Sequence, residues 1–120
     1  MSRVTKLDVL LEYTDSYDDT AVPAIVAYLK LEKIASLHPR YLQQLARMLV
    51  FMSRSEVQFN YSGAVTSLRR LYRKSPEFLL AYQELVKRGL LVELPALDGV
   101  NVAATNTLSH LIETLEELGQ

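Results

Sequence analysis

The stretch that decides the fold runs from Gly63 to Thr105 and reads GAVTSLRRLYRKSPEFLLAYQELVKRGLLVELPALDGVNVAAT. Its first part, residues 64–74, has apolar side chains at helical spacing, which predicts an amphipathic helix. The opposite face of this helix carries a row of basic side chains: Arg69, Arg70, Arg73 and Lys74. The row itself contains no carboxylate, and the nearest one, Glu77, lies four residues past Arg73 and can neutralise only part of the positive charge.

A second helix is expected directly after a tight turn. Ser75 stands where an N-cap belongs and Pro76 occupies the first helical position. Gly89 fits a left-handed C-terminal cap. Beyond it, two short apolar runs, 90–94 and 100–104, flank an Asp-Gly turn and predict a β-hairpin.

The order helix, turn, helix, two-stranded wing resembles the winged helix-turn-helix domain. The segment Leu85–Leu91, LVKRGLL, is similar to the end of the recognition helix and the first wing strand in the multiple-antibiotic-resistance regulator family. The resemblance covers residues 57–118 and implies a DNA-binding transcriptional regulator that is not an enzyme. The first helix would then lie against phosphates and the second would enter the major groove. The DNA-binding residues implied in this way are Arg69, Arg70, Arg73, Lys74, Gln83, Lys87 and Arg88.

Several residues depart from what DNA recognition needs. The groove-facing positions implied by the resemblance are Glu77, Leu80, Ala81, Gln83, Glu84 and Lys87. Two glutamates and a leucine read bases poorly, and the wing tip at 95–99 has no Lys or Arg. The alternative hypothesis is a winged-helix protein-interaction module that does not bind DNA. Leu80, Leu94 and Leu97 would then contact a protein partner, and the basic row would meet an acidic surface on it.

Length, charge and residue content set limits on these hypotheses. A chain of 120 residues suits a single domain with one core. Residues 54–88 hold seven basic and three acidic side chains, whereas residues 89–120 hold five acidic and no basic ones. The absence of cysteine excludes disulfides and thiol catalysis. Because no signal-peptide pattern or long apolar run occurs, we expect a cytoplasmic protein that does not enter the membrane.

Catalytic and metal-binding patterns find little support in the sequence. The two histidines, His38 and His110, are far apart, and neither has a cysteine near it. His110 and Glu113 have a spacing that two-metal bundles use in pairs, but no second copy occurs. No glycine-rich phosphate loop or glycine-flanked nucleophile is present. We therefore expect no catalytic residues, no metal and no cofactor.

The remaining elements are predicted from periodicity. Residues 1–53 form a helical extension, 54–105 the helix-turn-helix with its wing, and 106–120 a C-terminal helix, all within one mostly α domain. Within them we expect helices over 4–13, 22–36, 40–53 and 107–118, and a short strand over 57–61 that pairs beside the wing. Asp19 or Thr20 is expected to cap the second of these helices. The helix over 40–53 is apolar around most of its circumference, which predicts the central buried helix.

The C-terminal helix admits two interpretations. Its apolar stripe can pack on the core of its own chain, or it can form a homodimer interface as in the resembled regulators. In the second case the interface residues are Leu108, Leu111, Ile112 and Leu115. Asn106 or Thr107 is expected to cap this helix, and the helix at 4–13 would provide a companion surface.

Overall fold

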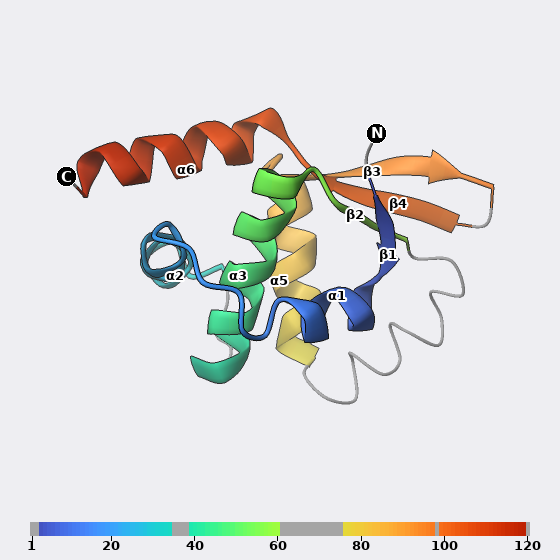
Figure 1. The fold of residues 1–120 in the computed structure, drawn as a ribbon. Coiled ribbons are helices and arrows are strands. Elements are labelled where there is room, and N and C mark those ends of the chain that lie inside the picture. Colours follow the sequence, from blue (N-terminus) through green and yellow to red (C-terminus); the bar gives the residue numbers. More distant parts are fainter. Residues whose placement is uncertain (1–2, 35–38, 61–75, 98, 120) are drawn as a thin grey trace.

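The computed structural model describes residues 3–34, 39–60, 76–97 and 99–119, within which the chain forms five helices and a four-stranded sheet (Figure 1). The predicted helix over 64–74, with its four basic residues, lies outside the described residues. The elements in chain order are β1 (Val4–Lys6), α1 (Leu7–Tyr13), α2 (Val22–Leu31), α3 (Pro39–Ser55), β2 (Gln58–Asn60), α5 (Pro76–Lys87), β3 (Leu91–Ala96), β4 (Gly99–Ala104) and α6 (Asn106–Leu118).

The sheet has the strand order β1-β2-β4-β3. Strands β3 and β4 form an antiparallel hairpin in which Leu91 faces Ala104, so the predicted β-hairpin is confirmed. β2 pairs antiparallel with β4, with Phe59 opposite Val102, which confirms the short strand beside the hairpin. Because paired residues point to the same face, Leu91, Phe59 and Val102 all turn toward the core.

The prediction of a helix over 4–13 is wrong for its first turn. Residues 4–6 form the strand β1, which runs parallel to β2 with Val4 opposite Gln58. The Gln58 N–H donates a hydrogen bond of 2.8 Å to the Arg3 carbonyl oxygen. β-branched Val4 and Thr5 favour a strand where a partner edge is available, and this tertiary pairing overrides the local helical spacing. The sheet is therefore mixed, whereas the sequence predicted only antiparallel pairing.

The helix predicted over 22–36 ends five residues early. α2 stops at Leu31, and Lys33 adopts a left-handed conformation with φ 54°. The Ile34 N–H then donates to the Leu29 carbonyl oxygen at 3.1 Å, and the Lys33 N–H donates to that of Lys30 at 3.1 Å. This pair of bonds is a Schellman cap. It turns the chain while returning Ile34 to the core.

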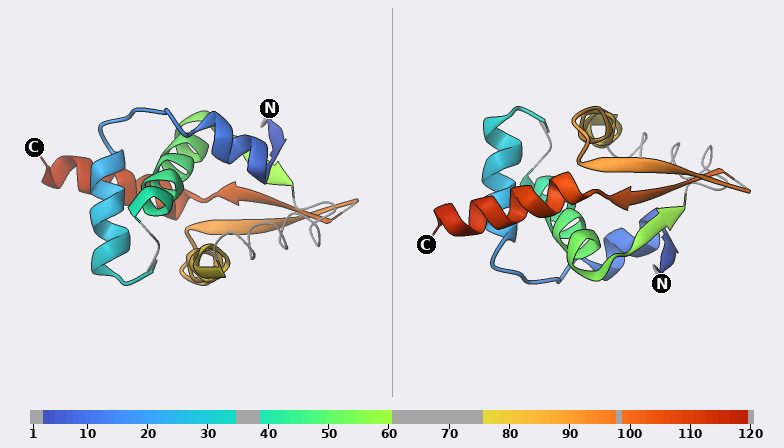
Figure 2. Two further views of the ribbon diagram at one scale, coloured as in Figure 1. Left: turned by 90° about the horizontal axis from the view of Figure 1, so that it is seen from below. Right: turned by 90° about the horizontal axis from the view of Figure 1, so that it is seen from above.

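The central position of α3 is confirmed. Its buried side chains are Leu42, Leu45, Ala46, Met48, Leu49, Val50 and Met52. The helices α1, α2 and α6 and the strand β4 all contact it. In Figures 1 and 2, α6 starts where β4 ends and runs away from the hairpin, so the two extend in opposite directions from the core around α3. None of the helices in the described ranges has the length and apolar character required to cross a membrane.

Candidate nucleic-acid interface

Helix α5, the predicted recognition helix, is fixed by one buried face and presents another to solvent. Ala81, Tyr82 and Leu85 are buried, and the Tyr82 ring lies edge-on to that of Phe59 with centroids 6.4 Å apart. The predicted placement of Ala81 in the groove-facing set is therefore wrong. It falls one turn before Leu85 and on the same side of the helix, so it packs inward.

The solvent side of α5 offers little for reading bases. Gln83 and Lys87 are exposed, as predicted for groove-facing positions. Leu80 shares their side of the helix and is 63% exposed. Its side chain has no donor or acceptor, so among the side chains that the structure describes on this face, Gln83 and Lys87 are the ones that can donate hydrogen bonds to a nucleic acid.

Arg88, predicted to bind DNA, is already paired within the chain. Its Nε donates to Glu84 Oε1 at 3.0 Å, and its Nη1 donates to Glu32 Oε2 at 3.2 Å. Hydrogen bonds to Glu84, Glu32 and Tyr28 raise the pKa of Arg88 above its ordinary value. Glu84, Glu32 and Tyr28 therefore occupy hydrogen-bonding positions around the guanidinium that a DNA phosphate would otherwise use. Glu32 and Tyr28 belong to the end of α2, which the sequence did not connect to α5.

The hairpin presents apolar side chains instead of cations. Val92 and Leu94 are exposed on the face of β3 opposite the buried Leu91. Leu97, at the turn between the strands, is fully exposed. No Lys or Arg occurs between Leu90 and Ala104, so the hairpin carries no side chain that would pair with a phosphate.

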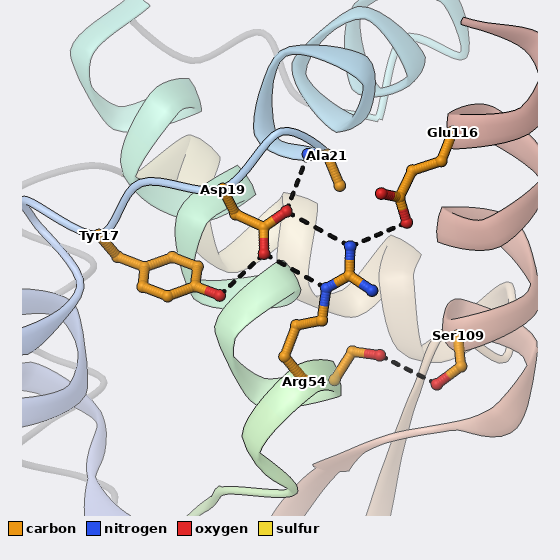
Figure 3. A network of polar contacts seen from close by, with 7 residues as sticks. Tyr17, Asp19, Ala21, Arg54, Ser109 and Glu116 are labelled. Carbon is orange, nitrogen blue, oxygen red and sulfur yellow. Dashed lines mark hydrogen bonds and ion pairs between the residues drawn. The ribbon is translucent and has the colours of Figure 1, made fainter. Parts of the chain in front are cut away.

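A second polar cluster joins three parts of the fold that are far apart in sequence (Figure 3). The Arg54 guanidinium, at the end of α3, pairs with Asp19 Oδ2 at 3.3 Å and with Glu116 Oε1 on α6 at 2.8 Å. The Tyr17 hydroxyl and the Ala21 N–H also donate to Asp19, at 3.0 and 2.9 Å. Arg54 therefore ties the segment before α2 and the helix α6 to α3.

The charge state of Asp19 follows from these contacts. Partial burial acts to raise the pKa of Asp19, but the hydrogen bonds from Ala21, Arg54 and Tyr17 outweigh burial and lower it. Asp19 was predicted, with Thr20 as the alternative, to be the N-cap residue of α2, and it is not. Ala21 is the N-cap residue of α2 and has no side-chain cap, and Asp19 binds the Ala21 N–H just before the helix begins.

We expect Asp19→Asn to lower the free energy of unfolding by about 1 kcal/mol at neutral pH, since it removes one charge-assisted pair with a partly exposed arginine. A lowered folded-state pKa means that the carboxylate stabilises the fold above its unfolded pKa and loses this effect as the pH falls through the folded pKa. Urea unfolding of both proteins at pH 7 and near pH 3 measures the difference. A gap between the two proteins that stays constant on acidification would contradict the prediction.

Of the two histidines considered for metal binding, His38 lies outside the described residues, and His110 has Glu113 beside it. His110 Nδ1 lies 3.9 Å from Glu113 Oε2, and both side chains are largely exposed on α6. In the ranges that the structure describes, no three His, Cys, Asp or Glu side chains are grouped so that they could hold a metal ion.

The apolar stripe of α6 divides into two sets. Leu108 and Ile112 are buried in the core of their own chain, whereas Leu111 and Leu115 are half-buried and Leu118 is exposed. Only the second set keeps apolar surface that another molecule could cover. The predicted caps are wrong by one or two residues: Thr105 caps α6, its hydroxyl accepting from the Leu108 N–H at 3.2 Å.

Gln83 and Lys87 are thus exposed on α5, and Arg88 follows the end of α5 and is paired with Glu32 at the end of α2. The basic row at 69–74 lies outside the described residues. The Arg88 and Arg54 clusters were missed by the sequence analysis. Of the contacts in these clusters, only the Glu84–Arg88 ion pair could have been predicted locally, from its spacing of four residues on a helix. No protein-family model, curated protein or solved structure matches this chain.

Proposed function

We propose that this chain is a winged-helix domain that binds duplex DNA mainly through the phosphates. The observation that carries the proposal is the order α3, β2, α5, β3, β4, with β2 paired beside the β3–β4 hairpin. This is the arrangement expected from the winged helix-turn-helix resemblance, in which the strand leading the sheet lies next to the wing. The basic row of residues 69–74 comes directly before α5, where the resemblance implies a phosphate-facing helix.

The composition of the α5 surface supports binding with little sequence discrimination. Phosphate contacts position a protein on DNA, whereas base contacts specify the sequence. The proposed phosphate contacts are Arg69, Arg70, Arg73, Lys74 and Lys87. On α5 only Gln83 has the amide geometry for a bidentate contact to adenine, which is worth about 1–3 kcal/mol of discrimination.

The test is binding of the full chain to a random-sequence duplex, measured by fluorescence anisotropy from about 0.05 to 0.3 M salt. Each phosphate contact contributes about 0.9 to the slope of log affinity against log salt. Five contacts therefore predict a slope of roughly −4 to −5. A protein that binds no duplex at the lowest salt concentration contradicts the proposal.

A second function is favoured by one observation, the exposure of Leu80 and Leu97. In this alternative the winged helix is a protein-interaction module, and these leucines are buried by a protein partner. Leu80→Gln separates the alternatives. On a DNA-binding α5 the new amide leaves duplex affinity unchanged or higher, whereas a protein interface loses an apolar contact and weakens.

We also propose that the chain forms a homodimer through α6, as the resemblance implies, using the half-buried Leu111 and Leu115. Replacing both by Glu is expected to give a monomer, because two carboxylates would be buried without partners in the interface. Sedimentation velocity at high micromolar concentration measures the change, and circular dichroism establishes that the variant is folded. His110→Glu, on the exposed side of α6, is the matched control and should remain dimeric. A monomeric wild-type protein under these conditions rejects the dimer.

A further inference from the structure

The end of α5 contains an arginine that is well suited to bind a phosphate but is occupied by carboxylates of its own chain. Arg88 follows Lys87 directly and lies on the flank of α5 beside the exposed face of Gln83 and Lys87. Its guanidinium can form two parallel hydrogen bonds with an anion. In the described chain one donor of each such pair is taken: Nε donates to Glu84 at 3.0 Å and Nη1 donates to Glu32 at 3.2 Å, and the Arg88 side chain also has a hydrogen bond with Tyr28.

The two carboxylates come from different parts of the fold. Glu84 is one helical turn before Arg88 on α5, so its pairing with Arg88 is local. Glu32 is the C-cap residue of α2, within the N-terminal extension, and it reaches Arg88 across a separation of 56 residues. The extension therefore bears directly on the helix for which DNA contact is proposed.

All three side chains remain accessible from solvent. About a third of the Arg88 side chain is exposed, and Glu84 and Glu32 are 34% and 43% exposed. Ion pairs between groups this exposed contribute little to stability. Stability of the fold therefore does not explain why Arg88 is paired with both glutamates. Its larger effect is on the electrostatics at the end of α5, where two negative charges neutralise the arginine and repel a phosphate.

We propose that Glu32 and Glu84 withhold Arg88 from DNA, so that Arg88 is a phosphate-binding residue kept out of use by the N-terminal extension and by α5 itself. This inference rests on the proposed DNA-binding function. It assigns Glu32 and Glu84 an inhibitory role, and it predicts that removing their charges adds one phosphate contact to the complex.

The experiment is a cycle of variants assayed for random-sequence duplex binding across salt concentrations. Glu32→Gln with Glu84→Gln keeps the size of both side chains and removes their charges. This double variant is expected to steepen the salt slope by about one unit, because one more arginine displaces counterions. Arg88→Met in the wild-type background is expected to leave the slope unchanged. Arg88→Met in the double variant should return the slope to the wild-type value, which distinguishes a new Arg88 contact from a general loss of repulsion.

Glu113→Gln with Glu117→Gln is the matched control for net charge, since it also removes two negative charges, from exposed residues of α6 away from α5. It should leave the slope unchanged, and thermal unfolding of every variant establishes that the fold persists.

The outcomes separate this inference from the function on which it rests. If the wild-type protein binds duplex and the double variant has the same slope, the inhibitory role is overturned and DNA binding stands. If Arg88→Met alone lowers the wild-type slope by about one unit, Arg88 already contacts DNA and the inference is likewise overturned. If only the double variant binds, and Arg88→Met abolishes that binding, the inhibitory role is supported, whereas duplex binding by the wild-type protein is contradicted. If no variant binds duplex, the proposed function and the inference both fail.

Discussion

Replacing Phe59 with Ala is expected to lower the free energy of unfolding by about 3–5 kcal/mol, the largest effect on stability that we predict for a single substitution. Phe59 is fully buried at the centre of β2, faces Val102 across the strand pair and contacts the ring of Tyr82 on α5. Its removal would leave a cavity where the sheet meets α5. Urea unfolding at neutral pH measures the loss.

The control for this substitution is Val92→Ala on the exposed face of the hairpin. Val92 has 37% of its surface in solvent, so the change should cost less than about 1 kcal/mol. If Phe59→Ala costs no more than this control, β2 is not the strand that joins the sheet to the core.

The second large effect concerns DNA affinity. Arg69→Ala combined with Arg73→Ala is expected to reduce the salt slope by about two units and to weaken binding roughly 60-fold at 0.1 M salt, because each phosphate contact contributes about eightfold there. Glu77 stands four residues past Arg73 and neutralises only part of the row, so an external anion is the natural partner of these charges. The loss should be similar on duplexes of different sequence, since phosphates carry no sequence information.

Lys6→Ala with Lys30→Ala is the matched control, because it removes two exposed positive charges from β1 and α2, outside the proposed interface. Equal losses in the two double variants would mean that net charge alone governs binding. Loss of a protein partner by the Arg69 and Arg73 variant, with no duplex binding by the wild-type protein, would favour the interaction module instead.

How far the sequence predicts this fold is clearest at the two helix ends closed by a Schellman cap. At the end of α5, Gly89 has φ 76°, and the Leu90 N–H donates to the Leu85 carbonyl oxygen at 3.0 Å. A glycine there signals the stop, and the prediction was correct. At the end of α2 the same hydrogen bonds form around Lys33, which gives no such signal. The predicted helix was therefore too long.

Long-range pairing accounts for the other differences. Val4 and Leu7 have helical spacing, but β2 supplies an edge that draws residues 4–6 into the sheet. The Arg88–Glu32 and Arg54–Asp19 pairs likewise join residues with no local relation in the chain. Periodicity reports which face of an element is apolar, and it carries no information about which distant charges will meet. For the candidate site, the sequence correctly predicted the exposure of Gln83 and Lys87 and did not predict the pairing of Arg88 with Glu32.

The middle position of β2 has a consequence for the order in which the protein is made. One of its edges pairs with β1, which leaves the ribosome before α1, α2 and α3, and the other pairs with β4, which follows only after α5 and β3. During synthesis β2 can pair with β1 as soon as β2 has been made. Its pairing with β4 is possible only after most of the remaining chain has been made. Until β4 arrives, the nascent protein exposes an unpaired strand edge, a known template for association between chains. The brevity of β2, three residues from Gln58 to Asn60, limits that exposure.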